Sequence, residues 1–538
     1  MTCFRLPAIL AAAALLLLNG CGKRETQVES GNRDGILHLG NRSEPQDIDP
    51  QVVTGVTENH VITAVLEGLV ADDPVDLHPV PGVAESWDIS EDGRTYTFHL
   101  REDARWSNGD PVTAMDFLRS YQRMLTPSLA AEYSYMLHYV VNARAYNLGT
   151  ETDFAKVGFE APDSRTLRIT LYQPTPYFLS MLTHYSWFPV HLPTVEKFGG
   201  LDRKGTRWTL PGNFVGNGPF TLKEWIPNQI LTVERSETYW DRDRVRLNEI
   251  RFYPVESLDT EERMFRTGQL HITQEVPLSK IDIYKRDYPE RIRIAPYLGT
   301  YYLRVNVTRP PLDDVRVRKA LALALDRESL VTHVTRGGQI PAYNFTPPGT
   351  AGYTAKARIE GDLDDARRLL AEAGYPGGKG FPKFELLYNT SESHRTTAEA
   401  LQQMWSANLD IEVGLVNQEW KVYLDSMDNL DFSVARAGWI ADYVDPHVFL
   451  ELFVTGGGNN DTGWSNPRYD ELLHAALMAP DIETRYGIYQ EMESILMTDL
   501  PVIPVYFYTR VNLVHPSVKG YHSNILDRHP YKHIYLQE

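Results

Sequence analysis

Alternating apolar and polar residues give the clearest structural signal near the start of the chain. In the stretch SWDISEDGRTYTFHL, the apolar residues Tyr96, Phe98 and Leu100 recur at a period of two. Glu91–Gly93 lies between the two halves of this stretch and has the composition of a tight turn. The pattern therefore predicts a β-hairpin with one buried face.

A helical pattern follows this hairpin within the stretch WSNGDPVTAMDFLRSYQRML. Thr113 is a suitable N-cap, and Asp116 three residues later makes a variant capping box. Phe117, Tyr121 and Met124 then recur at helical spacing. We expect an amphipathic helix that begins just after Thr113.

Helix and strand patterns alternate irregularly along the rest of the chain. Helices are predicted over 311–330 and 362–374, and strands over 384–389, 410–417 and 501–508. A chain of 538 residues is too long for one core. The sequence therefore predicts a mixed α/β protein of two or three domains.

The first 34 residues are predicted to lie outside the fold. Ala8–Leu18 is apolar but too short for an ordinary membrane span. The residues LNGC that end at Cys21 resemble a bacterial lipobox, although Asn19 is unusual there. We expect a lipoprotein signal peptide over 1–20, a lipid on Cys21 and a tether over 21–34. A conventional signal peptide with an incidental cysteine is the alternative.

Composition and motifs argue against several classes of function. The formal net charge of −18 is unsuited to binding nucleic acid. The two cysteines, Cys3 and Cys21, both fall in or at the signal, so no thiol remains for a disulfide, a metal or a nucleophile. The chain has no HExxH or GxSxG motif, and GYPGGKG lacks the residues of a phosphate loop. We predict no metal, no cofactor and no enzymatic activity.

Polar and aromatic residues gather instead at the ends of predicted strands in the second half. In an open α/β sheet such ends are the usual place for a ligand. Arg436 and Asp442, a cation and a carboxylate six residues apart, suit a ligand that carries both charges. Each residue alone is more often structural, and a surplus of 30 Tyr and 10 Trp can equally enlarge a core. The candidates are His394, Trp420, Arg436, Trp439, Asp442, Tyr506 and Tyr508.

Several stretches together resemble one known family. AESWDISEDGRTYTFHLREDARWSNGDPVTAMDF resembles the signature region of family 5 solute-binding proteins, the receptors of peptide-importing ABC transporters. NGPF, DVRVRKALALALDR, YNTSESH, NQEW, RAGWIADY and IPVYFY follow in the family's order. The resemblance covers nearly the whole mature chain and is greater to the oligopeptide-binding (OppA-type) branch than to the dipeptide or nickel receptors.

The resemblance implies a class II periplasmic-binding-protein fold, in which two lobes close by a hinge. Domain I is expected to be discontinuous, at 35–71, 191–297 and 509–538. Domain II is expected at 72–190 and domain III at 298–508. Domains I and III would close over the ligand.

The resemblance also implies a role for each candidate residue. An extended peptide would be buried between the lobes, with its backbone bound like an added strand. Asp442 would hold its α-amino group. Arg436 and His394 are candidates for its carboxylate, and Trp420 and Trp439 for the walls of side-chain pockets.

The same resemblance implies roles for two further residues and draws attention to a missing cysteine pair. Glu58 would face the cleft from domain I, and Tyr508 is a less certain lining residue. Oligopeptide receptors of the enteric type carry a cysteine pair where this chain has Gly299 and Ile440. Both cysteines are missing here.

Two pocket residues of the family also differ in this chain. Arg304 stands where those receptors have an acid, and Met427 where they have an arginine. This suggests that the pockets favour an acidic ligand side chain near Arg304. The alternative is that Arg304 points to solvent.

These features predict a lipid-anchored, monomeric receptor of the cell envelope that delivers oligopeptides to an ABC importer. Its partners would be short peptides, the permease subunits and, through Cys21, a membrane. It would lie in the periplasm or on the outer face of the cytoplasmic membrane. A receptor for murein or signal peptides is the alternative within the family, and a secreted hydrolase is a remote one.

Overall fold

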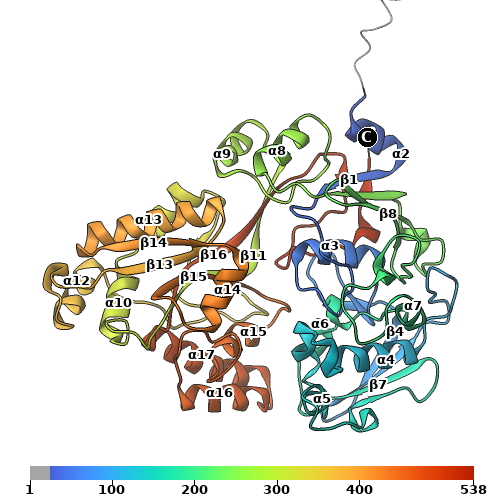
Figure 1. The fold of residues 1–538 in the computed structure, drawn as a ribbon, viewed down its shortest axis with the longest axis horizontal. Coiled ribbons are helices and arrows are strands. Elements are labelled where there is room, and N and C mark those ends of the chain that lie inside the picture. The colour runs from blue at the N-terminus through green and yellow to red at the C-terminus, as the bar shows by residue number, and fades with distance from the viewer. Residues whose placement is uncertain (1–24, 538) are drawn as a thin grey trace, which may run out of the picture.

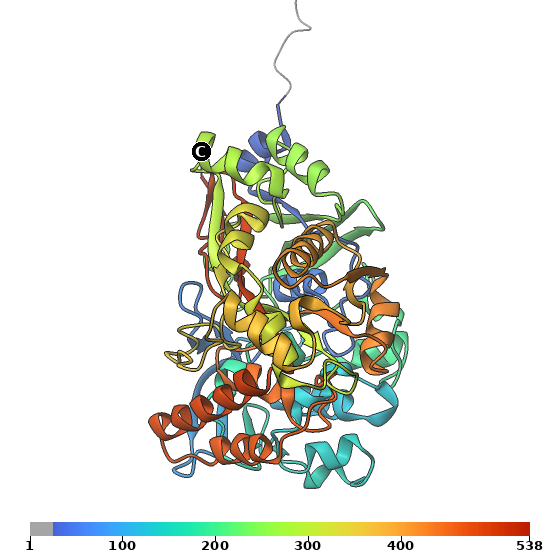
Figure 2. The ribbon, with the colours of Figure 1, turned by 90° about the vertical axis from the view of Figure 1, so that its left-hand side faces the viewer.

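The computed structural model describes residues 25–537 and shows two lobes joined by two long strands (Figure 1). In the end-on view of Figure 2, the lobe with the orange helices lies in front of the other lobe. The linking strands are β11 (Ile292–Val305) and β16 (Val502–Leu513). Most of the chain between them forms the second lobe, and the rest forms the first lobe. Within residues 25–537, no helix has the length and apolar character needed to span a bilayer. The predicted signal peptide and Cys21 lie outside the described residues.

The first lobe contains a four-stranded sheet in the order β1-β10-β9-β8. β1 runs parallel to β10, and the other pairs are antiparallel. Buried aliphatic side chains such as Leu37, Val233 and Ile250 form its core face. Its elements are β1 (Ile36–Gly40), α3 (Val56–Val65), α7 (Leu192–Phe198), β8 (Phe220–Ile226), β9 (Ile230–Arg235) and β10 (Glu249–Tyr253).

The predicted tether is wrong for its last eight residues, which form helix α2 (Gln27–Asp34). Thr26 and Glu29 make a capping box, and Gly35 ends the helix in the left-handed region at φ 68°. Val28 is 3% exposed and its amide bonds to the Gly268 carbonyl, so the helix packs onto the lobe. The composition is polar because only one face of this short helix is covered.

A second four-stranded sheet, in the order β4-β5-β7-β6, completes the first lobe. Its hairpin of β4 (Ala84–Ile89) and β5 (Thr95–Leu100) is the one predicted from the alternating pattern. Helix α4 (Ala114–Leu125) begins after Thr113 with the predicted capping box. The other elements are β2 (Val70–Asp72), β3 (Pro79–Pro81), α5 (Ala143–Asn147), β6 (Phe159–Glu160), β7 (Thr166–Thr170) and α6 (Phe178–Met181).

The second lobe is built on a six-stranded mixed sheet in the order β12-β16-β11-β15-β13-β14. The strands β13 (Phe384–Asn389) and β14 (Val413–Gln418) confirm two predicted strands, with a shift at the start of the second. The remaining strands are β12 (Ile340–Pro341) and β15 (Val434–Ile440). The helices are α10 (Val315–Leu323), α11 (Arg327–Ser329), α12 (Leu363–Glu372), α13 (Glu392–Leu409), α14 (Trp420–Asp428), α15 (His447–Leu450), α16 (Pro467–Leu477) and α17 (Ile482–Asp499).

The helix predicted over 311–330 is broken into two. α10 ends at Leu323, and Asp326 caps a new turn by accepting a bond from the Ser329 amide at 2.9 Å. Arg327 is 2% exposed and donates to the Ala322 and Pro504 carbonyls, both at 2.9 Å. The bond from Arg327 pairs a backbone carbonyl in the last turn of α10, and the cap at Asp326 starts a new turn in a different direction.

The linking strands β11 and β16 are paired at both ends and irregular between them. Pairing runs from Ile292 to Pro296, breaks, and resumes at Thr300. The predicted domain boundaries, 297/298 and 508/509, both fall within these two strands. Helices α8 (Leu258–Arg266) and α9 (Leu278–Asp287) lie beside this link (Figure 1).

Candidate functional site

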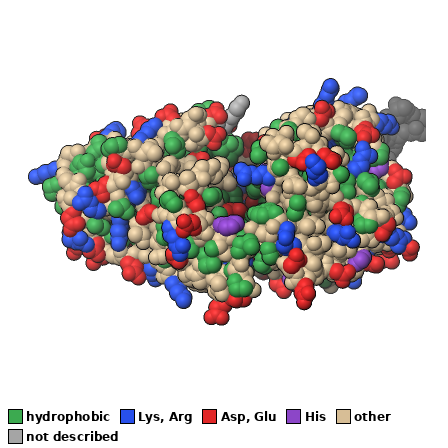
Figure 3. Space-filling model, turned by 90° about the horizontal axis from the view of Figure 1, so that it is seen from below, with side chains coloured by type: hydrophobic (Ala, Val, Ile, Leu, Met, Phe, Trp, Pro, Cys, Tyr) green, Lys and Arg blue, Asp and Glu red, His purple; other side chains and the backbone are tan. Residues whose placement is uncertain are grey.

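A deep hollow separates the lobes when the molecule is seen from below (Figure 3). One interlobe groove has a volume of about 1120 Å³ and is lined from both lobes, for example by Tyr135 and Glu451. Another, of about 670 Å³, is lined by Arg42 of the first lobe and Thr390 of the second. Charged and aromatic side chains that face this interlobe region are therefore candidates for ligand contacts.

Arg436 lies inside strand β15, not beyond its end as the sequence predicted. β15 is longer than expected because β11 pairs with it from Val305↔Val434 to Gly299↔Ile440. The register sets Arg436 opposite Leu303 of β11. The same pairing places Trp439 inside the strand, so only Asp442 follows it.

The Arg436 guanidinium is held by neutral groups. Nη1 donates to Asn389 Oδ1 at 3.1 Å, and Nη2 donates to the Tyr508 hydroxyl at 2.9 Å. The guanidinium carbon lies 5.0 Å from the centre of the Tyr301 ring. Among residues 25–537, no carboxylate forms an ion pair with Arg436, and its buried Nε has no hydrogen-bond partner. The site thus presents a largely buried positive charge without a counterion.

Gly438 makes room for this arrangement. A Cβ at position 438 would collide with the Tyr508 hydroxyl and would lie 3.1 Å from Arg436 Nη2. Tyr508 also packs 6.1 Å from Tyr301, ring centre to ring centre. The lining role predicted for Tyr508 thus becomes, in this structure, a hydrogen bond that orients Arg436.

His394 belongs to the first turn of α13 and lies close to Arg436. Its Nδ1 is 3.4 Å from the Asn389 carbonyl, and its ring is 6.2 Å from that of Tyr301. Burial, together with the positive charge of Arg436, lowers the pKa of His394 to about 3. The imidazole is therefore neutral at physiological pH, and Arg436 carries the charge of this cluster.

Asp442 follows β15 and faces the first lobe. The Tyr135 hydroxyl, from the first lobe, donates to Asp442 Oδ2 at 3.4 Å. Burial raises the pKa of Asp442 to about 7, and Arg528 and Tyr135 oppose that rise. No ion pair of Asp442 occurs within the described part of the chain. A ligand ammonium here would pair with a carboxylate that has no protein cation on its oxygens.

Phenol rings close the lobes around Asp442. Tyr177 of the first lobe stacks on Tyr443 at 4.9 Å, with 5° between the ring planes. The Tyr139 hydroxyl donates to Glu451 Oε2 at 3.3 Å across the same boundary. We call this contact the interlobe seam, formed by Tyr135, Tyr139 and Tyr177 against Asp442, Tyr443 and Glu451.

The two tryptophans predicted as walls differ in their surroundings. Trp439 is partly buried, and its buried indole Nε1 has no hydrogen-bond partner among the described residues. Trp420 begins α14, is 52% exposed and stacks on Tyr423 at 5.5 Å. The Tyr423 hydroxyl donates to the Arg436 carbonyl, so the Trp420–Tyr423 pair packs beside strand β15.

Glu58 is 6% exposed on α3 and is bound within the first lobe. Its Oε1 accepts from the Gln46 amide at 2.9 Å, and its Oε2 accepts from the Thr57 hydroxyl at 2.8 Å. Both carboxylate oxygens therefore already have protein donors. The predicted place of Glu58 beside the cleft stays a prediction.

Arg304 is not the free cation that the sequence suggested. It forms an ion pair with Asp461 Oδ2 at 2.5 Å, and the two side chains are only 12% and 13% exposed. At this exposure the Arg304 side chain does not point to solvent, so that alternative is wrong. The preference for an acidic ligand side chain near Arg304 stays a prediction. Met427 is 1% exposed in a cluster with Leu387, Tyr423 and Phe432, so it is a core residue.

The comparisons with known proteins agree on one family. Residues 78–461 match the model of "Bacterial extracellular solute-binding proteins, family 5 Middle". The chain is 40% identical to the periplasmic oligopeptide-binding protein OppA of Escherichia coli, covering 89% of this chain and 88% of that protein. It belongs to family 5 of the bacterial extracellular solute-binding proteins.

Solved structures of family 5 proteins superpose well on this one. The E. coli murein tripeptide binding protein MppA matches with a TM-score of 0.83 and 35% identity, over 93% of this chain and 98% of that one. Haemophilus influenzae OppA in complex with RPPGFSPFR gives 0.81 and 36%, over 94% and 99%. The predicted two-lobe class II fold is therefore confirmed.

The two positions without cysteines are direct neighbours in this family 5 protein. Gly299 on β11 and Ile440 on β15 are paired across the sheet. A Cβ at Gly299 would collide with the Ile440 side chain. Ile440 therefore fills the space above Gly299.

Asp445, which had no predicted binding role, has a structural one. Its carboxylate is 4% exposed and bonds to Arg485 Nη1 at 2.8 Å and Nη2 at 2.5 Å. It also accepts from the His447 amide at 2.9 Å. This buried pair anchors the loop that carries Asp442.

Sequence reasoning missed three residues of the site in this family 5 protein. Asn389 and Tyr301 hold Arg436, and Tyr135 reaches Asp442 from the other lobe. Asn389 lies within the quoted motif YNTSESH, whose position at a strand end was the available signal. Nothing in the local sequence distinguishes Tyr135 or Tyr301 from the other tyrosines.

Proposed function

We propose that this protein captures short peptides between its lobes and delivers them to an ABC importer. One observation carries the proposal. Arg436 and Asp442 lie six residues apart on one short segment of the second lobe, and Asp442 contacts Tyr135 of the first lobe. Neither residue forms an ion pair within residues 25–537. A free peptide supplies the two missing charges. The OppA relatives and the complex of H. influenzae OppA with a peptide support this assignment.

The ligand end groups would be bound by groups of different chemistry. Asp442 would take the α-amino group, because a carboxylate in a low-dielectric site gains most from a cation. Arg436 would take the α-carboxylate, with neutral His394 beside it as an uncharged partner. Tyr508 would keep Arg436 oriented through its hydrogen bond to Nη2.

The spacing of these two residues sets the ligand length. A strand advances about 3.3 Å per residue, so the Cα atoms of residues 436 and 442 are at most about 20 Å apart. The two side chains span part of that distance. An extended peptide held between them would therefore have fewer than about six residues.

The ligand side chains would meet walls of mixed character. Trp439 and Trp420 would supply apolar faces, Glu58 would shape the first-lobe side, and bound water would satisfy other side chains at little cost. A ligand carboxylate near Arg304 would compete with Asp461, so we expect only a weak preference for acidic side chains. The protein would carry out no chemistry and would need no cofactor.

Delivery would depend on lobe closure about β11 and β16. The interlobe seam buries Asp442 only when the lobes meet, so ligand binding and closure favour each other. The domain division at 297/298 and 508/509 follows from this picture, because both boundaries lie in the linking strands. The partner would be the permease of an importer that recognises the closed form.

The location of the protein rests on its first residues. A lipid on Cys21 would hold a monomeric receptor at a membrane of the cell envelope. Helix α2 packs on the first lobe, so the connecting segment between lipid and fold would be short. Globomycin sensitivity of processing and a mass shift at Cys21 would test the anchor separately from binding.

A receptor for murein peptides or for signal peptides is the second candidate, favoured by the similarity to MppA. A hydrolase remains the remote alternative. Mass spectrometry of small molecules released on denaturing the purified protein separates these functions. Short peptides of varied sequence support the first, and muropeptides or one defined peptide the second. Cleaved products from added peptides would overturn both.

A further inference from the structure

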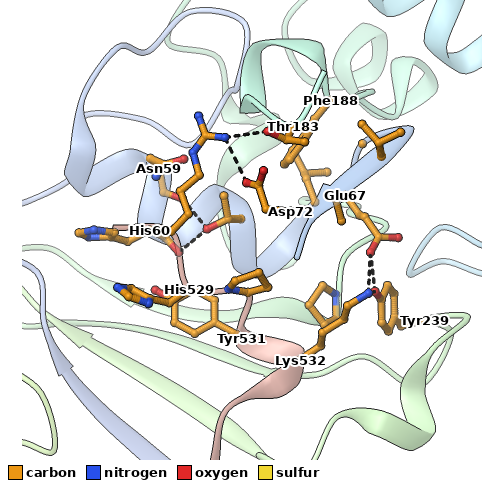
Figure 4. Close-up of a pocket in the computed structure, with 18 of the residues that line it drawn as sticks. Asn59, His60, Glu67, Asp72, Thr183, Phe188, Tyr239, His529, Tyr531 and Lys532 are labelled. Carbon is orange, nitrogen blue, oxygen red and sulfur yellow. Dashed lines mark hydrogen bonds and ion pairs between the residues drawn. The ribbon is translucent and has the colours of Figure 1, made fainter. Parts of the chain in front are cut away.

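The guanidinium of Arg528 joins three chain segments next to Asp442. Nη1 donates to Asp72 Oδ2 at 3.1 Å and to Thr183 Oγ1 at 2.7 Å, both in the first lobe (Figure 4). Nη2 donates to the Asp442 carbonyl oxygen at 2.6 Å, in the second lobe. The Arg528 side chain is 14% exposed and that of Asp72 is 7% exposed. One buried side chain thus bridges the two lobes at the proposed amine-binding residue.

The backbone that carries Arg528 is firmly placed. Asn524 accepts from the Arg528 amide at 3.1 Å and donates to its carbonyl at 2.6 Å. Asp527, one residue earlier, pairs with Arg510 of β16 at 2.5 Å, with both side chains about 10% exposed. The guanidinium therefore projects from a C-terminal segment that is attached to a linking strand.

The same segment contacts the other linking strand where its pairing breaks. The Leu298 amide of β11 donates to the Ile525 carbonyl at 2.6 Å. The Leu298 carbonyl accepts from the Ala441 amide at 2.8 Å. Leu298 lies between Pro296 and Thr300, where β11 and β16 are out of register. A closed path of bonds therefore runs from Asp442 through Arg528, Ile525 and Leu298 back to Ala441.

We propose that Arg528 is a positioning residue, which fixes Asp442 against the first lobe on closure and so couples amine binding to closure. The inference rests on the proposed role of Asp442 in peptide capture. Arg528 would not touch the peptide, because its donors are directed to Asp72, Thr183 and the Asp442 main chain. Its charge also favours the ionised Asp442 that an ammonium requires.

A small cavity beside Arg528 fits this role. It has a volume of about 90 Å³ and is lined by Asn59, Asp72 and His529, among others (Figure 4). Asp72 Oδ1 and His529 Nδ1 are buried without a hydrogen-bond partner from the described residues. The space suffices for about three waters at about 30 Å³ each. Arg528 also lines this cavity, so water there would offer Nη2 a partner in place of the Asp442 carbonyl if the lobes open.

The test compares two variants that both carry the D72N substitution and differ only at position 528. R528Q alone would leave Asp72 buried without its cation and could unfold the lobe. The double variant R528Q/D72N removes both charges and the interlobe bond. The matched control D72N keeps Arg528 and its bond to the Asp442 carbonyl. Donor and acceptor dyes on cysteines introduced at the exposed residues Ile89 of β4 and Ile482 of α17, one in each lobe, report closure.

We expect the double variant to lose at least tenfold in affinity for a free tripeptide relative to D72N, mainly through faster dissociation. We also expect its closed population without ligand to fall at least threefold in single-molecule energy transfer. Equal affinity and equal closure in the two variants would overturn the inference. If wild-type protein binds no peptide, the proposed function fails, and the closure measurement without ligand still decides the role of Arg528.

Discussion

Replacing Asp442 by Asn should weaken peptide binding while it stabilises the ligand-free protein. The substitution keeps the shape of the side chain and removes its charge. Loss of a largely buried charge pair costs about 2 to 4 kcal/mol, because Asn retains one hydrogen bond to the ammonium. This corresponds to about a 30- to 1000-fold loss of affinity. Isothermal titration calorimetry with a free tripeptide measures this loss of affinity. The substitution should change the affinity for the same peptide with an acetylated amine only little.

The stability change has the opposite sign and a defined pH range. Burial moves the pKa of Asp442 from 3.8 to about 7, so the ionised form destabilises the fold. The cost is absent below about pH 4, grows as the pH rises toward 7 and reaches about 2 to 4 kcal/mol above it. Asp442→Asn should therefore raise the free energy of unfolding at pH 8 and leave it unchanged at pH 4. Undiminished affinity together with reduced stability at pH 8 would refute this reasoning.

Three further outcomes follow from the same geometry. Arg436→Met should lower the affinity for a free tripeptide at least tenfold but change the affinity for its C-terminal amide little, as titration calorimetry would show. Affinity for free-amine peptides should fall about tenfold per pH unit below about pH 7, because Asp442 must lose its proton; a flat profile down to pH 5 would contradict this. Asp445→Asn should lower the free energy of unfolding by about 3 to 5 kcal/mol, because it leaves Arg485 buried without its partner, and urea unfolding measures it.

Local patterns predicted elements whose signals lie within one segment. The hairpin at 84–100 and the helix after Thr113 were correct, because alternation, a turn and a capping box coincide there. α2 was missed although Thr26 and Glu29 form a capping box, because the segment is polar and its packing on the lobe is a tertiary contact. The break after Leu323 depends on Arg327 reaching β16, which no local window contains.

Local sequence also predicted only part of the candidate site. Arg436 and Asp442 were identified from one short segment and from the family resemblance. Their environment comes from residues far away in the sequence, since Tyr508 holds Arg436 and Tyr135 faces Asp442. The ion pair of Arg304 could not be predicted from the local sequence, because its partner Asp461 is 157 residues further along the chain.

The most direct test of the account is calorimetric titration of one tripeptide in four forms. The forms are free, N-acetylated, C-amidated and blocked at both ends. The account predicts that the free peptide binds tightest, that each single block costs at least tenfold, and that the doubly blocked peptide does not bind measurably. A doubly blocked peptide that binds as tightly as the free one would contradict the claim that the cleft binds both charged termini of the peptide.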